Sequence, residues 1–305
     1  MRVRDFQVTD VFAGGGGLSR GMMNAGFGVR AAFDNWRPAI AFYKSNFKHE
    51  IIDCDLNDDK GAARKIQDFN PQIIVGGPPC QDFSSAGKRD ENGSRANLTI
   101  SYAKIVASLQ PRFFIMENVD RAVKSRSFYS AITLFKKAGY GLTTRILDAS
   151  FCGAPQIRKR VFVIGELEGT DDFLSSLITE ALASKRMTVR DYLGDAIDVD
   201  YYYRHPRSYM RRGIFSVDEP SPTIRGINRP VPAGYTGHPG DPVKISKQIR
   251  PLSTMERALI QTFPTSVQLE GTKTDVDQII GNAVPIKLAE FVANALAKHI
   301  RTLKA

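Results

Sequence analysis

The chain has 305 residues, 42% of them hydrophobic and 24% charged, and 42 basic against 32 acidic residues give a net charge of +10. This composition is typical of a globular protein with one large domain, or with a large and a small one. We see neither an apolar run of the roughly 18–20 residues that span a bilayer nor a secretory signal, and expect a cytoplasmic protein without a membrane partner. The positive charge favours a polyanionic partner, although a basic surface can also serve solubility alone.

Three isolated cysteines, Cys54, Cys80 and Cys152, form no C-x-x-C pair. An odd and sparse set argues against a disulfide framework and against a structural zinc site, so we expect a reducing compartment and no metal. Each cysteine is then either a core residue or a reactive thiol.

Short β-rich runs alternate with amphipathic stretches over the first two thirds of the chain. The predicted strands are Val8–Phe12, Val29–Phe33, Gln72–Val75, Arg112–Met116, Leu142–Leu147 and Val161–Ile164. The predicted helices between them are Leu18–Ala25, Pro38–Asn46, Lys60–Phe69, Leu98–Leu109 and Phe128–Ala138. This alternation predicts an α/β fold with a mostly parallel sheet covered on both faces, which binds ligands beyond the carboxyl ends of its strands.

The pattern changes after Met187, because residues 190–249 are rich in Pro, Gly, Arg and Tyr. This composition favours a smaller, loop-rich folded domain, with a disordered insertion as the alternative. Regular patterning resumes with helices at Ser253–Gln261 and Ile286–Ile300. We therefore expect a large first domain, a smaller second domain that begins near residue 190, and a C-terminal stretch of regular structure.

A strand leads into four glycines and a helix in the segment Asp10-Val-Phe-Ala-Gly-Gly-Gly-Gly-Leu18. Such a turn lets the backbone approach a ligand and aims a helix N-terminus at it, although a purely structural turn has the same signature. The spacing differs from a dinucleotide fingerprint, since Ser19 occupies the sixth position from Gly14. Asp34 follows the second strand, where an acidic residue commonly accepts hydrogen bonds from ribose hydroxyls, and Asp55 follows the next extended segment. For each of them singly, an ordinary surface carboxylate is the alternative. Together these features indicate a nucleoside-bearing cofactor.

The segment Gly76-Gly-Pro-Pro-Cys80-Gln81 places a thiol on a rigid turn at a strand end. The prolines fix the backbone, and such a thiol is a candidate nucleophile. Glu117 follows a strongly apolar strand, where desolvation should raise the pKa of its carboxyl group and let it donate a proton. Arg158 and Arg160 alternate before a further strand and point to one side, as an anion or base clamp requires; a solvated edge strand is the alternative.

These segments, in this order, resemble the DNA cytosine carbon-5 methyltransferases of bacterial restriction-modification systems. The match comprises the glycine turn with Phe12, Pro79-Cys80-Gln81, Glu117-Asn118-Val119 and Gln156-Ile-Arg158-Lys-Arg160. It continues with the segment from Arg250 to Pro264 and ends in Gly281-Asn282-Ala283-Val284-Pro285. The resemblance implies a Rossmann-like methyltransferase sheet and S-adenosyl-L-methionine as cofactor. It also implies a catalytic and cofactor-binding domain at 1–190, a target-recognition domain at 191–271, and a C-terminal segment at 272–305 that returns to the first domain.

The resemblance also implies individual roles. Cys80 would be the nucleophile, Glu117 and Arg160 would hold the target cytosine, and Arg158 would support them. The cofactor would contact Phe12, Gly14, Gly15, Gly16, Gly17, Leu18, Asp34, Asn35, Asp55, Pro79, Leu98, Asn282 and Val284. Two departures stand out: Asn35 occupies a position where the family often has an aromatic residue, with Trp36 next, and Phe151-Cys152-Gly153 replaces an acidic-aromatic-glycine run.

The implied partner is double-stranded DNA, bound by a monomer. A separate cognate restriction endonuclease is a further candidate partner, and the sequence leaves its presence open. The loop Ser84–Arg95 resembles a mobile lid that closes on DNA, and a plain surface loop is the alternative. Arginine reads guanine and also neutralises phosphates. We expect DNA contacts from Gln81, Ser84, Lys88, Arg95, Arg204, Arg207, Thr223, Arg225 and Arg229.

Two other functions compete with this interpretation. An RNA cytosine carbon-5 methyltransferase would share the fold, but that branch usually departs from the Pro-Cys-Gln motif. A non-catalytic sequence-specific DNA-binding regulator would explain the charge and the second domain. It would leave Cys80, Glu117 and Arg160 without a purpose.

Overall fold

The computed structural model describes residues 2–79, 98–206, 208 and 210–303. Within them, seven strands form one sheet in the order β3-β2-β1-β4-β5-β8-β6. The strands are β1 (Gln7–Val11), β2 (Gly28–Asp34), β3 (Glu50–Asp53), β4 (Ile73–Gly76), β5 (Phe113–Val119), β6 (Tyr140–Asp148) and β8 (Lys159–Leu167). The first five are parallel, and β8 runs antiparallel to both β5 and β6. The predicted α/β, Rossmann-like sheet is therefore confirmed.

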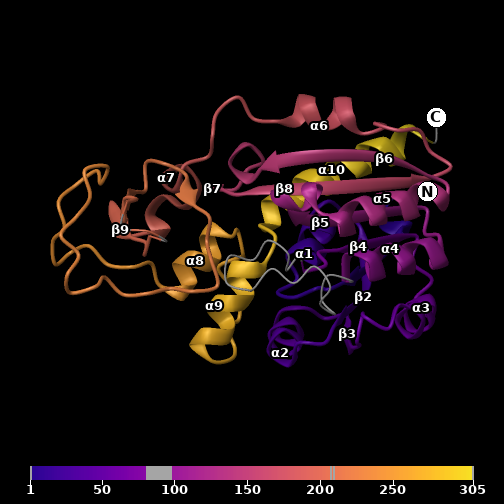
Figure 1. Ribbon diagram of the computed structural model, residues 1–305, viewed down its shortest axis with the longest axis horizontal. Coiled ribbons are helices and arrows are strands. Elements are labelled where there is room, and N and C mark those ends of the chain that lie inside the picture. Colours follow the sequence, from indigo (N-terminus) through magenta and orange to yellow (C-terminus); the bar gives the residue numbers. More distant parts are fainter. Residues whose placement is uncertain (1, 80–97, 207, 209, 304–305) are drawn as a thin grey trace.

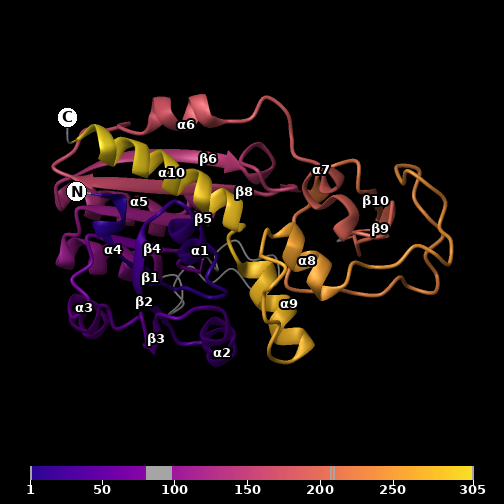
Figure 2. The same ribbon diagram turned by 180° about the vertical axis from the view of Figure 1, so that it is seen from behind.

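Helices cover both faces of this sheet (Figures 1 and 2). On one face α1 (Gly17–Asn24), α6 (Ser175–Ala181) and α10 (Ile286–Thr302) pack on strand residues such as Val8 and Ile115. On the other face α3 (Asp59–Gln67), α4 (Leu98–Leu109) and α5 (Arg126–Lys137) pack on residues such as Ile74 and Phe114. The strands are apolar on both sides, as central strands covered on both faces require. α2 (Arg37–Asn46) lies beside β3.

All the predicted strands and helices are present, with ends that differ by a few residues. The edge strand β3, together with α6 and α9 (Lys273–Asn282), was not among the predictions. The described residues also include four 3₁₀ helices, at Val3–Asp5, Asp120–Lys124, Ala149–Phe151 and Gly194–Ala196.

The 191–271 region, orange in Figure 1, lies at one end of the molecule, away from the sheet. Its regular elements are few and short, namely the end of α7 (Val189–Leu193), β9 (Tyr201–Tyr203), β10 (Ile214–Ser216), β11 (Ser221–Pro222) and α8 (Thr254–Ile260). Its apolar side chains nevertheless form a core with α8 and α9, which includes Tyr202, Phe215, Ile224 and Leu252. The described part of this region is therefore folded, and the alternative of a disordered insertion is wrong there.

The chain returns from this region to the sheet through α9 and α10. α10 lies along α1 on the sheet face (Figure 2). The helical stretch Lys273–Thr302 is long and apolar enough to cross a membrane by length and composition alone. However, 72% of its most apolar window is buried inside the protein, as expected for a core helix.

Candidate functional site

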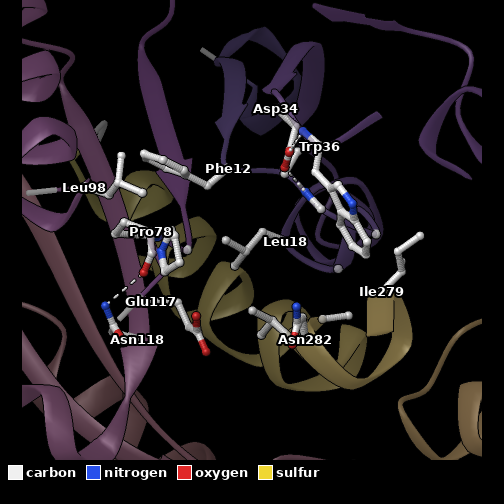
Figure 3. Close-up of a pocket in the computed structure, with 18 of the residues that line it drawn as sticks. Phe12, Leu18, Asp34, Trp36, Pro78, Leu98, Glu117, Asn118, Ile279 and Asn282 are labelled. Carbon is white, nitrogen blue, oxygen red and sulfur yellow. Dashed lines mark hydrogen bonds between the residues drawn. The ribbon is translucent and has the colours of Figure 1, made fainter. Parts of the chain in front are cut away.

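A cavity of about 880 Å³ opens at the carboxyl ends of β1, β2, β4 and β5, where the predicted fold binds ligands. Figure 3 shows Phe12, Leu18 and Asp34 on one part of its wall, Glu117 and Asn118 on another, and Ile279 and Asn282 on a third. Many residues predicted from the sequence line it: Phe12, Gly14, Gly15, Gly17, Leu18, Asp34, Asn35, Asp55, Pro79, Leu98, Glu117, Arg158, Arg160, Asn282 and Val284. Gly16 is part of the same turn but does not line the cavity.

The glycine turn needs its small residues for two different reasons. Gly14 and Gly16 have φ values of +53° and +76°, which favour glycine. Gly17 begins α1, and a Cβ atom there would collide with the carbonyl oxygen of Val284. The turn therefore lies directly against the segment that follows α9, and these two stretches form neighbouring walls of the cavity.

Asp34 ties the end of β2 to the glycine turn. Its Oδ2 accepts a hydrogen bond from the Gly14 amide at 2.8 Å, and its Oδ1 accepts one from the Trp36 amide at 2.9 Å. Burial raises the pKa of the Asp34 carboxyl group above its ordinary value. Asp55 accepts a bond from the Asn57 amide at 2.9 Å. Each carboxylate oxygen keeps a further lone pair for a ligand hydroxyl or amino group.

Asn118 fixes the chain just before the predicted nucleophile. Its Nδ2 donates to the carbonyl oxygen of Pro78 at 3.1 Å, joining the end of β5 to the segment after β4 (Figure 3). Cys80, Gln81, Ser84, Lys88 and Arg95, with the predicted lid Ser84–Arg95, lie outside the described residues.

Glu117 and Arg160 form an ion pair on the cavity wall. Arg160 Nε lies 2.8 Å from Glu117 Oε1, and both side chains are largely buried. Burial raises the pKa of Glu117, whereas the guanidinium groups of Arg160 and Arg158 oppose that rise. The expected direction of the shift is confirmed. Such a carboxyl group can hold or deliver a proton at a bound base.

Arg158 is 2% exposed, and its guanidinium bridges two distant parts of the chain. Nη1 donates to the carbonyl oxygen of Ile224 and Nη2 to that of Gly281, both at 3.0 Å. Burial lowers the pKa of Arg158 well below its ordinary value. β8 lies between β5 and β6, so the alternative of a solvated edge strand is wrong. Because β8 is antiparallel, its first residues reach the same edge at which the parallel strands end.

Of the arginines predicted to read DNA, the three that the structure describes, Arg204, Arg225 and Arg229, do not line the main cavity. Arg204 Nη2 donates to the carbonyl oxygen of Thr223 at 2.8 Å, and Arg225 donates to that of His205. Thr223 donates to the carbonyl oxygen of Ile157 at 2.8 Å. Arg229 is exposed, and Arg207 lies outside the described residues. Arg204, Arg225 and Arg229 line one small hollow together.

The two described cysteines, Cys54 and Cys152, are core residues. Both are buried, and burial raises the pKa of Cys152 to about 12. A thiol held in its neutral form is a poor nucleophile. In the described ranges, no group of three or more His, Cys, Asp or Glu residues is arranged to hold a metal ion.

Several lining residues were missed as site residues by reasoning from the sequence. They are Ala13, Trp36, Leu56, Asn57, Gly77, Pro78, Asn118, Val119, Gln278, Ile279, Gly281 and Ala283. Most of them are sequence neighbours of predicted site residues, so the motifs that identified those residues could also have identified these. Gln278 and Ile279 come from α9, and nothing in their local pattern indicates a ligand.

Comparisons with known proteins extend over nearly the whole chain. A family model described as "C-5 cytosine-specific DNA methylase" matches residues 6–298. The chain is 55% identical over 289 residues to Type II methyltransferase M.HindV of Haemophilus influenzae, covering 94% of this chain and 95% of that protein. It is 54% identical over 291 residues to Type II methyltransferase M.HgiDI of Herpetosiphon aurantiacus, covering 95% and 94%.

Solved structures share the fold at lower identity. The Dnmt2 methyltransferase of S. pombe is similar with a TM-score of 0.70 at 15% identity, covering 98% of this chain and 99% of that one. The methyltransferase EhMeth of Entamoeba histolytica has a TM-score of 0.69 at 21% identity, with coverage of 98% and 99%.

Proposed function

Because this chain belongs to the C-5 cytosine-specific DNA methylases, of the type found in restriction-modification systems, we propose that it methylates cytosine within a specific duplex sequence through a Cys80 adduct, with S-adenosyl-L-methionine as donor. The observation that carries this proposal is the buried Glu117–Arg160 pair, which shares one cavity with the glycine turn and Asp34.

The cavity fits the donor in size and chemistry. A volume of about 880 Å³ accommodates a nucleoside cofactor and a base side by side. We assign Asp34 and Asp55 to the ribose and adenine groups, and the glycine turn, Phe12, Leu18, Pro79, Leu98, Asn282 and Val284 to the remaining contacts. Trp36 also lines the cavity. Asn35 has no aromatic ring, so we assign to Trp36 the stacking contact with the adenine ring of the donor. When bound, the donor supplies an electrophilic methyl group on sulfonium.

The residues of the chain act on the cytosine. A stacked base offers neither ring face, so the target is flipped out of the duplex into the cavity. The Cys80 thiolate adds to carbon 6 while Glu117 protonates or hydrogen-bonds ring nitrogen 3, which makes carbon 5 nucleophilic without an unrelieved negative charge. Arg160 binds the exocyclic oxygen and Arg158 supports the pair. Carbon 5 takes the methyl group as the bond from that group to the sulfonium breaks, which leaves S-adenosylhomocysteine. Loss of the carbon 5 proton to a base then expels the Cys80 thiolate, returns any proton on ring nitrogen 3 to Glu117 and restores the ring.

We further propose that residues 191–271 form the target-recognition domain, that the protein acts as a monomer on cytoplasmic DNA, and that a separate endonuclease cuts the same site. The basic net charge and the arginines of this region support a DNA partner.

Incorporation of labelled methyl groups tests the proposal. The purified protein is incubated with methyl-labelled S-adenosyl-L-methionine and either duplex DNA or transfer RNA, and each nucleic acid is digested to nucleosides. We expect label in 5-methyldeoxycytidine only, and bisulfite sequencing then gives the site. Label in RNA alone would establish the RNA-acting alternative. A DNA mobility shift without any label would establish the binding regulator.

A further inference from the structure

A continuous chain of buried hydrogen bonds joins the 191–271 region to the cavity wall. It passes through two glutamines, Gln156 in β7 (Gln156–Ile157) and Gln261 at the end of α8, both 0% exposed. Gln156 Oε1 accepts from the Ile224 amide at 2.8 Å, and Gln156 Nε2 donates to Gln261 Oε1 at 2.7 Å. Gln261 Nε2 donates to the carbonyl oxygens of Ala283, at 3.1 Å, and Ile280.

The direction of this chain is fixed at both ends by the backbone. The Ile224 amide can only donate, so Gln156 must present its oxygen to it and its amino group to Gln261. The carbonyls of Ile280 and Ala283 can only accept, so Gln261 must present its amino group to them. Turning either side-chain amide round would set donor against donor or acceptor against acceptor in a site without access to water. The two glutamine side chains therefore have one arrangement of donors and acceptors.

Two further contacts join the same segments. Arg158 donates to the carbonyl oxygens of Ile224 and Gly281. Both backbone polar groups of Ile224 are therefore hydrogen-bonded, the carbonyl to Arg158 and the amide to Gln156. A Cβ atom on Gly281 would collide with the backbone of Arg225 and Gly226. Gly281 thus packs directly against the backbone of Arg225 and Gly226. Figure 1 shows α8 and α9 between the sheet and the rest of the 191–271 region.

The two ends of the chain have different surroundings. At one end Thr223 and Arg225, assigned above to DNA, flank Ile224. At the other end Gly281, Asn282, Ala283 and Val284 line the cavity assigned to the donor. The hydrogen bonds thus connect the segment assigned to DNA with the segment that lines the cavity.

We propose that Gln156 and Gln261 are positioning residues that couple target recognition to binding of the donor. The inference rests on the proposed function. Coupling between two sites is reciprocal. If DNA increases the affinity for the donor by a given factor, the donor increases the affinity for DNA by the same factor.

The test uses S-adenosylhomocysteine as the probe of the donor site. Its dissociation constant is measured for the full chain by calorimetry, alone and with a duplex that carries the site mapped by bisulfite sequencing. We expect the duplex to tighten binding by about tenfold in the wild type, within the usual range of coupling. In Gln156→Met and in Gln261→Met the factor should fall to about threefold or less, the remainder being carried by Arg158. Affinity without DNA should change little.

The double variant shows whether the two glutamines act through one hydrogen-bonded chain or contribute independently. Since both glutamines belong to one chain, the double variant should lose no more coupling than either single variant. Tyr140→Phe is the matched control, because it removes a buried hydrogen bond to Pro111, 2.6 Å long, on a remote face of the sheet. It should lower stability and leave the coupling factor unchanged. A factor within twofold of wild type in both glutamine variants would overturn the proposal.

Hydrogen exchange on the wild type tests the same coupling without a variant, and therefore applies even if a glutamine variant fails to fold. The cognate duplex alone, without donor, should slow exchange of the backbone amides in 280–286. Unchanged exchange there would reject the coupling. A wild type that puts no methyl group on DNA would instead reject the proposed function.

Discussion

Arg160 and Glu117 meet because β8 runs antiparallel to β5, in a register that sets Arg160 opposite Val119. The start of one strand therefore lies beside the end of the other, and Arg160 Nε reaches Glu117 Oε1 at 2.8 Å. A parallel β8 would have placed Arg160 at the opposite edge of the sheet. The strand direction thus brings a cation and a carboxyl group to the cavity from distant points in the sequence.

Removing Arg160 should alter both the rate of methyl transfer and its pH dependence. Arg160→Met takes away a charged hydrogen-bond donor, and we expect kcat to fall by roughly 10²–10³-fold. Arg160 lowers the pKa of Glu117. Its loss should raise that pKa, so the limb on which activity falls with rising pH should move to higher pH. The control is Arg145→Met on β6, which breaks an exposed ion pair between Arg145 and Asp172. A limb that stays in place or moves to lower pH would refute the role of Glu117 as a proton donor.

Asp34 should contribute to binding of the donor and not of DNA. Asp34→Ala removes a charged acceptor from the cavity, and we expect the affinity for S-adenosyl-L-methionine to weaken by about 1–3 kcal/mol, measured by calorimetry. Asp53→Ala is a close control. Asp53 is the register neighbour of Asp34 on the adjacent strand β3, but its side chain is exposed and does not line the cavity. Equal affinities for the two variants would show that Asp34 has been assigned wrongly.

Asp10 should make stability depend on pH. It is fully buried beneath the glycine turn, accepts bonds from the Ser19 amide at 3.0 Å and hydroxyl at 2.6 Å, and burial raises its pKa to about 7. A carboxyl group with a raised folded-state pKa costs stability as pH rises toward that pKa. The advantage of Asp10→Asn over wild type in free energy of unfolding should therefore grow by on the order of 2 kcal/mol between pH 5 and pH 8. Denaturant titrations with a constant difference would contradict this.

The arginines of the 191–271 region should separate into base readers and phosphate contacts. Loss of a base reader should cost roughly 1–3 kcal/mol and relax the methylated site at one position, whereas loss of a phosphate contact weakens all sequences and flattens the salt slope by about one unit. Methylome sequencing of Arg204→Ala, Arg225→Ala and Arg229→Ala distinguishes these effects. Arg190→Ala, which breaks exposed pairs with Asp200 and Asp218, is the control. If all three variants keep the wild-type site and rate, specificity lies elsewhere.

Much of the fold follows from the sequence because its signals are local. The 3.6-residue pattern of Ile286–Ile300 predicts α10, and the apolar run before Glu117 predicts β5. Two of the elements that were missed, β3 and α9, show the physical reasons. β3 is a four-residue edge strand with little pattern to read. α9 has weak amphipathicity, and its best signal was the cap formed by Thr272 with the Asp275 amide.

The site was only partly predictable because its geometry depends on contacts between distant segments. The sequence identifies Arg158, but not that its guanidinium joins Ile224 to Gly281. It identifies the segment that contains Gln156, but gives no indication that Gln261 completes a chain to the cavity wall. Such partners depend on the crossing of β7, β11 and α9 in space, which no local pattern specifies.

Covalent trapping tests the central claim, that Cys80 attacks the target cytosine. Wild-type protein is incubated with S-adenosyl-L-methionine and a duplex carrying 5-fluorocytosine at the mapped site, and the complex is analysed by intact mass and peptide mapping. Fluorine blocks the final elimination, so the account predicts a stable adduct on Cys80, full trapping by Cys152→Ser, whose thiol is buried, and none by Cys80→Ser. An adduct on another residue, or methylation of ordinary DNA by Cys80→Ser at the wild-type rate, would contradict the account.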